Sequence, residues 1–472
     1  MTERASGVQA DVFDVAVVGG GVVGCAAFRE FTLAGARCVL LERNADLIDG
    51  ASKGNSGLLH TGFDAKPGSL EARCVRDGYR TYLEVRERLN LPLMATGAIL
   101  AAWTQEERER LPAIVARAQA NHVTDVRQIS REELRELEPG VSDAAVGGIL
   151  VPGESIIDPW SAPFAYALQG VLNGGVVRRS TEVLGGRLVD GIWRLSTSKG
   201  SLGARVVINC AGNFGDLVEA IARPSPFTIR PRKGQFVIFD KSAFGLVRGI
   251  LLPVPNERTK GVVVSRTAYG NLIVGPTAED QEDRTKATVD RKQLMNLIAQ
   301  GVRMVPALAG HQVTATYAGL RPATLETKDY VIEALPGQRW ITASGIRSTG
   351  LTAALGIAKH LRGLYEENFE TLAPLGDPVW PRVQNLSEGG PRRAFQAGRA
   401  EIVCHCEGVT RDDIEEALCE PLSARSLGGL KRRTRCMMGR CQGFYCSRRV
   451  LQIVGERIPD FTLPADSQDA AA

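Results

Sequence analysis

The sequence of 472 residues predicts an α/β fold that is divided into several domains. Three observations predict it. Residues 14–42 read as strand, glycine turn, helix and strand, residues 227–277 alternate in the manner of strands, and six cysteines crowd into residues 404–446. We therefore expect a Rossmann-like nucleotide-binding domain, an inserted α+β substrate domain with a mixed β-sheet, and a small helical C-terminal domain.

The N-terminal unit carries the pattern G-x-G-x-x-G directly after an apolar strand. Gly19 permits the tight turn, Gly21 lets a pyrophosphate approach the helix N-terminus, and Gly24 lets the helix pack closely on the strand. Glu42 ends the second strand, where its carboxylate can accept hydrogen bonds from the adenosine ribose. The pattern predicts a dinucleotide site without a 2′-phosphate, and leaves FAD and NAD both open.

Composition and charge limit the classes of protein to which this chain can belong. Hydrophobic residues make up 44% of the chain, which is enough for more than one core, and the formal net charge is +4. We find no apolar stretch of signal-peptide type before Asp14 and no window of about 18 apolar residues. We therefore expect a cytoplasmic protein without a transmembrane segment, in which crowded cysteines indicate metal or redox chemistry before disulfides.

A small-residue loop follows the first unit. Gly50-Ala51-Ser52-Lys53-Gly54-Asn55-Ser56-Gly57 is followed closely by His60. This order of motifs resembles the flavoprotein family of D-amino-acid oxidase and glycerol-3-phosphate dehydrogenase, and the resemblance covers residues 12–365. It implies FAD rather than NAD. The cofactor-binding residues that it implies are Gly19, Gly21, Val23, Gly24, Glu42, Arg43, Ser52, Asn55, Ser56, Val183, Ala211, Gly212, Gly345, Gly350, Leu351 and Thr352.

The middle of the chain alternates between helical and extended patterns. Residues 69–140 read as mostly helical, and residues 131–136 as a solvated helix face. Residues 176–212 read as short strands, and residues 340–352 as strand, glycine turn and helix start, whose N-terminus can stabilise an anionic reduced flavin. We expect an FAD-binding domain at 12–85, 150–225 and 325–365, a substrate domain at 86–149 and 226–324, a linker at 366–398 and a C-terminal domain at 399–455.

The resemblance also suggests catalytic residues. Arg321 matches an arginine that binds the substrate's phosphate or carboxylate, with a structural ion pair as the alternative. His60 matches a histidine near the flavin and is the candidate base, with simple packing as the alternative. Arg347 lies where it can contact the flavin or a substrate anion, and the alternative is a surface charge.

The cysteine segment contains C-x-C and C-x4-C pairs that suit an iron–sulfur cluster or one zinc ion. Zinc pairs usually have C-x2-C spacing, which favours the cluster, and a Rieske centre would need two histidines. The segment resembles the bacterioferritin-associated ferredoxin-like [2Fe-2S] module. The implied ligands are Cys404, Cys406, Cys436 and Cys441, and we expect Cys446 to be a buried thiol that can substitute as a ligand.

The basic run at residues 431–435 lies beside the third of these cysteines. It has no interleaved aromatic residues, so we do not expect nucleic-acid binding. We expect it to raise the reduction potential of the cluster or to dock an acidic redox partner.

Flavin and cluster together imply a dehydrogenase that passes electrons to a redox partner protein or a second flavoprotein subunit. By resemblance, the leading substrate is sn-glycerol 3-phosphate, a small anion that would be oxidised to dihydroxyacetone phosphate. A 2-hydroxy acid such as 2-hydroxyglutarate is an alternative, because Ser348-Thr349-Gly350-Leu351-Thr352 is similar to the SPGLT stretch of that relative. An amine or imino acid substrate, a non-catalytic electron-relay role within a complex, and peripheral membrane association through a partner are also left open.

Overall fold

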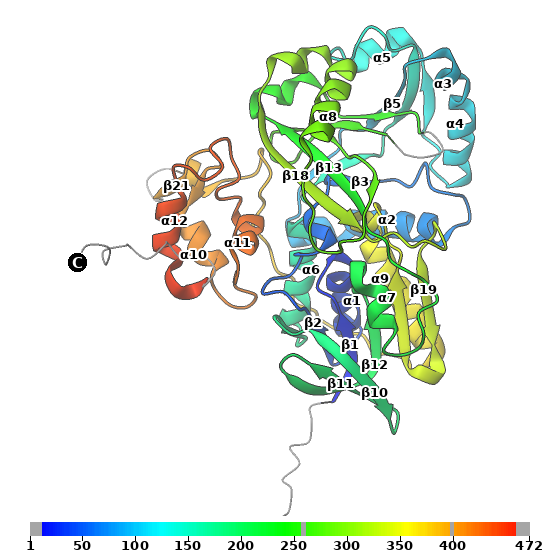
Figure 1. Cartoon of the computed structure of the whole chain (residues 1–472), viewed down its shortest axis with the longest axis vertical. Helices are drawn as coiled ribbons and strands as arrows, with labels where there is room; N and C mark the ends of the chain where they lie inside the picture. The colour runs from blue at the N-terminus through cyan, green and yellow to red at the C-terminus, as the bar shows by residue number, and fades with distance from the viewer. Residues whose placement is uncertain (1–11, 256–260, 397–400, 459–472) are drawn as a thin grey trace, which may run out of the picture.

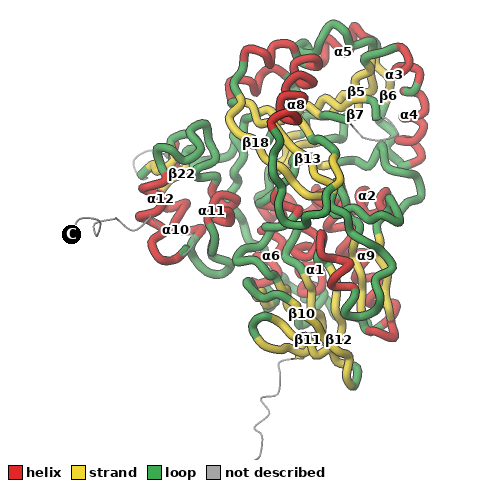
Figure 2. Tube along the Cα trace, in the orientation of Figure 1, coloured by secondary structure: helices red, strands yellow, loops and turns green. Residues whose placement is uncertain are grey.

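The computed structural model of the chain describes residues 12–255, 261–396 and 401–458. It shows two domains stacked on one another and a small C-terminal module at their side (Figure 1). Strands and helices alternate in the lower domain, while a large sheet fills the upper one (Figure 2). The α/β class, the inserted substrate domain and the small C-terminal module agree with the expectation.

The sheet of the lower domain has the strand order β10-β11-β12-β1-β2-β9, with β20 beside β12 and β19 beside β20. Strand β1 pairs in parallel with β12 and β2. Its apolar run is buried on both faces: Val15 and Val17 pack in the core that contains the helices, and the other face packs with Trp193 and Leu195 of β11. The bounds are β1 (Val12–Val18), β2 (Cys38–Leu41), β9 (Val176–Arg178), β10 (Val183–Val189), β11 (Ile192–Thr197), β12 (Gly200–Asn209), β19 (Val331–Leu335) and β20 (Trp340–Ser344).

The helices of this domain are α1 (Val22–Leu33), α2 (Leu70–Leu89), α6 (Ser161–Leu172), α7 (Gly215–Glu219) and α9 (Gly350–Asn368). Helix α2 begins at Ser69, whose side chain accepts the Ala72 N–H, and it packs along α9. A Cβ on Gly78 would lie 2.1 Å from the Thr352 carbonyl oxygen, so this crossing requires glycine. The domain boundaries expected at residues 85 and 365 fall inside α2 and α9.

The substrate-domain sheet has the order β17-β13-β16-β15-β14-β5-β7-β6, with β18 beside β13. It is mixed, because β14 pairs in parallel with β5 and its other ladders are antiparallel. The strands are β5 (Ala98–Ala102), β6 (Arg127–Ile129), β7 (Gly147–Val151), β13 (Arg232–Phe239), β14 (Ile250–Pro253), β15 (Val263–Arg266), β16 (Leu272–Gly275), β17 (Glu279–Asp280) and β18 (Val313–Arg321), and the helices are α3 (Gln105–Glu109), α4 (Leu111–Ala120), α5 (Arg131–Leu137) and α8 (Arg291–Met304).

The expectation of a mostly helical stretch at residues 69–140 was therefore partly wrong. Ala98–Ala102 is a fully buried strand between β14 and β7. A five-residue apolar run has no helical or strand period of its own, so its partner strands decide its conformation. Two further short strands lie in this stretch. Strand β6 pairs with β7, and β4 (Leu93–Met94) joins β8 (Ser155–Ile157) and β3 (Leu58–Leu59) in a small sheet.

Residues 369–396, most of the expected linker, lie along the surface of both domains. The Leu375 N–H donates to the Leu33 carbonyl, the Val383 N–H to that of Leu89, and the Glu388 N–H to that of Ala268. Leu386 is fully buried. The segment is therefore a packed strap rather than a loose tether, and its expected end at residues 397–398 lies outside the described residues, as do residues 399–400 of the expected C-terminal domain.

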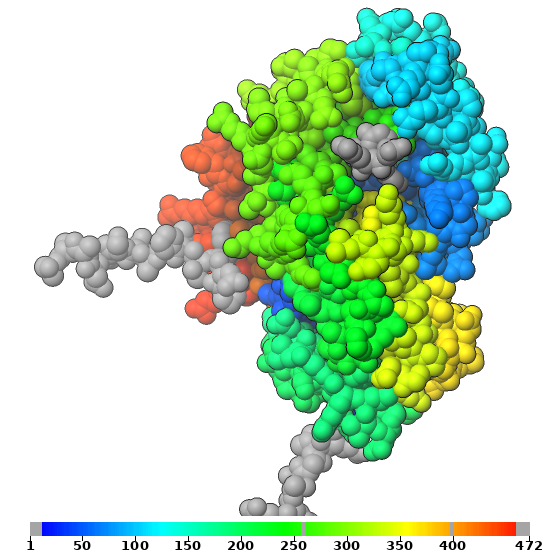
Figure 3. Space-filling view, turned by 45° about the vertical axis from the view of Figure 1, so that its right-hand side comes forward, coloured from blue at the N-terminus to red at the C-terminus, as the bar shows by residue number. Residues whose placement is uncertain are grey.

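The C-terminal module has a core of its own, built around Ile414, Leu430 and Val450. Its elements are β21 (Ile402–Cys404), β22 (Val409–Thr410), α10 (Arg411–Ala417), α11 (Leu427–Thr434) and α12 (Ser447–Val454). In the space-filling view its orange-red surface projects beside the green atoms of the substrate domain (Figure 3). Across the described parts of the chain, no helix combines the length and apolar character that crossing a membrane requires.

Candidate active site and cysteine module

A cavity of about 630 Å³ runs from the carboxyl ends of β1 and β2 to the substrate-domain strands β13 and β18. Most of the predicted cofactor residues line it, together with Arg321 and Arg347, whereas Gly24, Thr352 and His60 do not. The lining residues among the predictions are Gly19, Gly21, Val23, Glu42, Arg43, Ser52, Asn55, Ser56, Val183, Ala211, Gly212, Gly345, Gly350 and Leu351.

The glycine turn shapes one end of this cavity. Gly19 has φ +107°, a conformation that favours glycine, and a Cβ on Gly24 would lie 1.8 Å from the Gly19 carbonyl oxygen. Gly24 therefore lies outside the cavity and sets the approach of α1 to β1. The Val22 N–H donates to Ser52 Oγ over 2.9 Å, which places the hydroxyl of the small-residue loop at the N-terminus of α1. This end of the cavity suits a pyrophosphate.

Glu42 lies behind the turn and is buried. Its Oε2 accepts the Gly20 N–H at 2.8 Å and its Oε1 accepts the Asn44 N–H at 2.7 Å. Burial raises the pKa of this carboxyl group, while the two backbone N–H groups act in the opposite direction. The carboxylate is thereby fixed in place as an acceptor for ribose hydroxyl groups.

Three buried polar atoms that belong to cavity-lining residues have no hydrogen-bond partner among the described residues. They are Asn213 Oδ1, Ser344 Oγ and Arg347 Nε. Leaving such atoms unpaired costs about 1–3 kcal/mol each. A polar ligand in the cavity would remove that cost, so the residues present fit a bound dinucleotide and an anionic substrate.

Two arginines bring positive charge to the same cavity. Arg321, at the end of β18, donates to the carbonyl groups of Thr277 (2.6 Å) and Lys233 (3.2 Å), and Arg347 donates to those of Thr324 and Thr327. Burial, followed by the nearby Arg232, lowers the pKa of both, that of Arg321 to about 10. Neither forms a salt bridge with a described residue, which argues against a structural ion pair for Arg321 and favours a bound anion as its counter-charge.

His60 lies just outside the cavity lining. Its Nδ1 is 2.8 Å from Oε2 of the fully buried Glu154, and its backbone N–H donates to Thr352 Oγ1 in the first turn of α9. A carboxylate that accepts from Nδ1–H selects the tautomer in which Nε2 can accept a proton. Sequence reasoning missed the role of Glu154, because residues 60 and 154 are brought together only by the pairing of β3 with β8.

Four of the module's thiols interact in two pairs. Cys404 contacts Cys446 and Cys406 contacts Cys441. The hydrogen bond from Cys446 lowers the pKa of Cys404 to about 6, against the effect of burial. Within the described part of the chain, no three Cys, His, Asp or Glu side chains stand close enough to hold a metal ion without rearrangement.

Cys436 belongs to neither of these pairs. It is buried, as Cys404 and Cys446 are, burial raises its pKa to about 11, and its backbone N–H donates to Thr434 Oγ1 over 3.1 Å. The geometry therefore pairs three of the predicted ligands with one another or with Cys446, and leaves Cys436 outside the two pairs.

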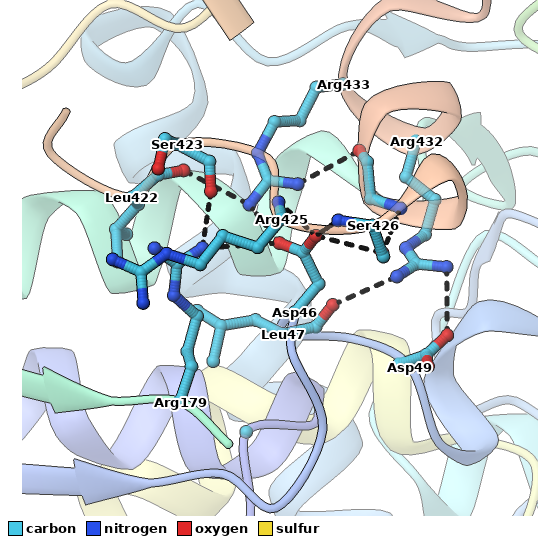
Figure 4. A network of polar contacts seen from close by, with 12 residues as sticks. Asp46, Leu47, Asp49, Arg179, Leu422, Ser423, Arg425, Ser426, Arg432 and Arg433 are labelled. Carbon is cyan, nitrogen blue, oxygen red and sulfur yellow. Dashed lines mark hydrogen bonds and ion pairs between the residues drawn. The ribbon is translucent and has the colours of Figure 1, made fainter. Parts of the chain in front are cut away.

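The module is attached to the nucleotide-binding domain by a buried aspartate (Figure 4). Asp46 has no exposed surface and accepts the N–H groups of Arg425 (2.8 Å) and Ser426 (2.9 Å) and the Arg433 guanidinium (2.7 Å). Arg179, beyond the end of β9, lies 3.4 Å from the same carboxylate and donates to the Ser423 carbonyl. We call this group of contacts the Asp46 network.

Two more arginines of the module make contacts near the Asp46 network. Arg432 pairs with Asp49 at 3.2 Å. The Arg435 guanidinium pairs with Glu407 and lies 3.7 Å from the centre of the Tyr269 ring. Three cations of the run at residues 431–435 thus bind groups of the chain itself, which leaves them unavailable for the expected docking of a partner.

A Tyr269–Trp160 stack extends this contact toward the cavity. The two rings lie 5.5 Å apart, and Trp160 Nε1 donates to the carbonyl of Lys53, which lines the cavity. Packed groups therefore join the cavity wall to Arg435, the residue before Cys436.

The dinucleotide turn, the cavity with two unneutralised arginines and the thiol-rich module define a redox protein with a nucleotide cofactor and a metal–thiolate centre. Residues 14–364 match the family of FAD dependent oxidoreductases, and residues 402–456 match the BFD-like [2Fe-2S] binding domain. The chain belongs to the FAD-dependent oxidoreductase family. FAD and a [2Fe-2S] cluster are its cofactors, as predicted, which sets the zinc alternative aside.

Several relatives share this organisation. A glycerol 3-phosphate dehydrogenase of Caloramator mitchellensis is 31% identical over 95% of both chains. One subunit of the anaerobic glycerol-3-phosphate dehydrogenase of Escherichia coli K12 is 27% identical over 92% of this chain and 86% of that one. The FAD-bound L-α-glycerophosphate oxidase of Mycoplasma pneumoniae superposes with a TM-score of 0.73 at 29% identity, covering 78% of this chain and 97% of that one.

Proposed function

We propose that this protein oxidises sn-glycerol 3-phosphate to dihydroxyacetone phosphate and passes the electrons through its cluster to a partner protein. The observation that carries the proposal is the pair Arg321 and Arg347. Both guanidinium groups line the cavity without a carboxylate partner among the described residues, and the Arg347 Nε is unpaired. A phosphate dianion supplies the missing counter-charge and accepts charge-assisted hydrogen bonds from both.

The chain's own groups then have distinct tasks. FAD, held by the glycine turn, Ser52 and Glu42, supplies the hydride acceptor when it is bound. Arg321 and Arg347 orient the substrate by its phosphate. His60 Nε2 takes the hydroxyl proton as the carbon loses its hydride and the carbonyl forms, and Glu154 holds the imidazole and stabilises its charge.

An anaerobic ultraviolet–visible titration tests the substrate. We expect glycerol 3-phosphate to bleach the flavin band and the broad cluster absorbance, and 2-hydroxyglutarate or an amine to bleach neither. Bleaching by 2-hydroxyglutarate alone would assign the chain to 2-hydroxy acids, a possibility supported by an L-2-hydroxyglutarate dehydrogenase of Indibacter alkaliphilus that is 29% identical over 56% of this chain. Bleaching by neither compound would favour an amine as the substrate, or a non-catalytic role as an electron relay.

Arg321→Lys tests the anion site. It keeps the charge but loses the planar fork, and the loss of charge-assisted hydrogen bonds worth about 1.5–3 kcal/mol raises KM for glycerol 3-phosphate by about 10- to 100-fold. Arg230→Lys is the control, because Arg230 pairs with the exposed Glu282. Equal KM values for both variants and the unchanged protein would contradict the assignment.

For the cluster we propose Cys404, Cys406 and Cys441 as ligands, with Cys446 as the fourth in preference to Cys436. The Cys404–Cys446 contact supports this choice. We expect Cys446→Ser to lose the cluster absorbance and Cys436→Ser to keep it, each measured in protein purified without air. The opposite result would restore Cys436 as the ligand.

We further propose that the partner is a separate polypeptide or redox protein in the cytoplasm. The Escherichia coli relative, which carries the name of one component of a multi-subunit dehydrogenase, matches this chain across both the flavin domain and the cysteine module, and this match supports such a setting. None of the ten cysteines, all of which lie in the described residues, is joined in a disulfide, which fits a reducing compartment.

A further inference from the structure

The turn between Cys441 and Cys446 presents two aromatic side chains to solvent. Phe444 is 81% exposed and Tyr445 is 82% exposed, and their rings meet edge to face with centroids 5.2 Å apart. Adjacent exposed rings of this size are unfavourable in water and usually mark an interaction surface.

Backbone contacts hold the turn in this conformation. The Phe444 N–H donates to the Cys441 carbonyl at 2.9 Å, and the Cys446 and Ser447 N–H groups donate to the Gly443 carbonyl. Gly443 has φ +93° and packs against Met437 beneath it. The two rings therefore project from a turn whose conformation is fixed by hydrogen bonds. This reduces the entropy cost of ordering the surface when a partner binds.

The segment of the sequence that contains this turn carries charged residues of one sign. Residues 421–455 contain eight Lys or Arg and no Asp or Glu. Arg432, Arg433 and Arg435 are committed to Asp49, Asp46 and Glu407 within the chain. Arg440 and Arg448, on either side of the aromatic pair in the sequence, remain exposed, and Arg440 keeps 71% of its side chain exposed although it lies 3.6 Å from Asp240.

The same turn lies beside the cysteines that we propose as cluster ligands, between Cys441 and Cys446. Cys406 and Cys441 are only partly buried, whereas Cys404 and Cys446 are buried. A protein that covers Phe444 and Tyr445 would therefore also cover the side of the module on which Cys406 and Cys441 are partly exposed.

We propose that Arg440, Phe444, Tyr445 and Arg448 form the docking surface for an acidic electron-transfer protein. This rests on the proposed function, in which the cluster passes electrons out of the chain. The aromatic pair supplies the apolar centre, and the two arginines attract an acidic rim. Each transfer oxidises the reduced cluster by one electron, reduces the partner's one-electron centre, and moves no proton.

Two haem proteins of opposite charge test the surface: the soluble domain of cytochrome b5, which is acidic, and cytochrome c, which is basic. The holoenzyme is reduced with dithionite and then freed of excess reductant, so that the haem receives electrons only from the enzyme and the test does not depend on glycerol 3-phosphate. Haem reduction is followed by stopped flow. We expect faster reduction of the acidic protein at low salt, an advantage that added salt removes. Arg448→Glu should slow that reaction by about tenfold and speed the one with cytochrome c.

The aromatic pair has a matched control. Phe444→Ala/Tyr445→Ala should slow reduction of cytochrome b5 several-fold and leave reduction of ferricyanide, a small acceptor, unchanged. Met295→Ala, at an apolar side chain that is 57% exposed on α8 of the substrate domain, should change neither rate. Equal rates for both haem proteins and no effect of Arg448→Glu would overturn the proposal. Loss of sedimentation with phosphatidylglycerol vesicles in the aromatic variant, where the unchanged protein sediments, would replace it with a membrane surface.

Discussion

Glu42 is held by backbone N–H groups of two segments, Gly20 from the glycine turn and Asn44 from its own loop. Both hydrogen bonds require an acceptor, and so do the ribose hydroxyl groups of a bound dinucleotide. Each contact therefore favours the ionised form, while burial disfavours it.

The raised pKa of Glu42 makes FAD binding sensitive to acid. In the apoprotein the carboxyl group takes up its proton as pH falls through a value above the ordinary 4.5. Bound FAD stabilises the carboxylate and lowers that pKa, so affinity must fall as pH falls between the two values. We expect fluorescence titration to show this loss, and Glu42→Gln to bind FAD about tenfold more weakly without the pH dependence. A Gln variant with unchanged affinity would contradict the role.

Cys436 and Cys446 show what spacing leaves open at the scale of residues. The separations 436–441 and 441–446 are the same, so the C-x4-C pattern alone does not choose between Cys436 and Cys446. Arg435 and Met437 both have positive φ values, of 66° and 62°, on either side of Cys436. These backbone conformations, which single-sequence patterns do not reveal, turn this cysteine into the core.

At the scale of elements, the loop after β2 carries two functions within a few residues. Glu42 and Ser52 line the cavity, and between them Asp46 and Asp49 hold the C-terminal module. A Cβ on Gly429 of α11 would lie 1.9 Å from Asp46 Oδ2, so the helix and the aspartate fit only with glycine there.

Asp46→Asn tests the buried network. The substitution leaves Arg179 and Arg433 without their buried counter-charge, and breaking such a pair costs about 3–5 kcal/mol. We expect a lower midpoint of guanidinium unfolding and faster trypsin cleavage in the strap. Asp49→Asn is the matched control, because the Asp49 side chain is 33% exposed and its pair contributes about 0–1 kcal/mol. Equal effects of the two variants would show that the module is held elsewhere.

At the scale of the whole molecule, the strap and the Asp46 network fix the module against both domains. Arg440 lies 3.6 Å from Asp240 of the substrate domain, while Arg432 and Arg433 bind the nucleotide-binding domain. The cavity and the cysteines of the C-terminal module therefore belong to one packed body rather than to two tethered domains.

Cys441→Ser separates the two halves of the reaction. Without a complete ligand set the cluster is lost, yet the cavity keeps all its groups. We expect glycerol 3-phosphate to bleach the flavin at the unchanged rate in stopped flow, and reduction of a haem-protein acceptor to be lost. If haem reduction persisted, electrons would leave the flavin directly and the cluster would have another task.

The sequence by itself determined the α/β class, the dinucleotide turn with Glu42, the family and both cofactors. These features depend on local spacing, because a strand, a glycine turn and a helix N-terminus form their site within one stretch of chain. It also suggested Arg321, as the counterpart of a family arginine, and Arg347, at a position where related enzymes vary.

Only the tertiary structure decided what depends on distant segments meeting. It paired His60 with Glu154, directed Arg432, Arg433 and Arg435 inward and placed Ala98–Ala102 in a sheet. The charge pattern of a sequence does not predict which acidic group a cation will pair with. A short apolar run likewise does not predict which strands will lie beside it. Those choices follow from packing and burial, which are properties of the folded chain as a whole.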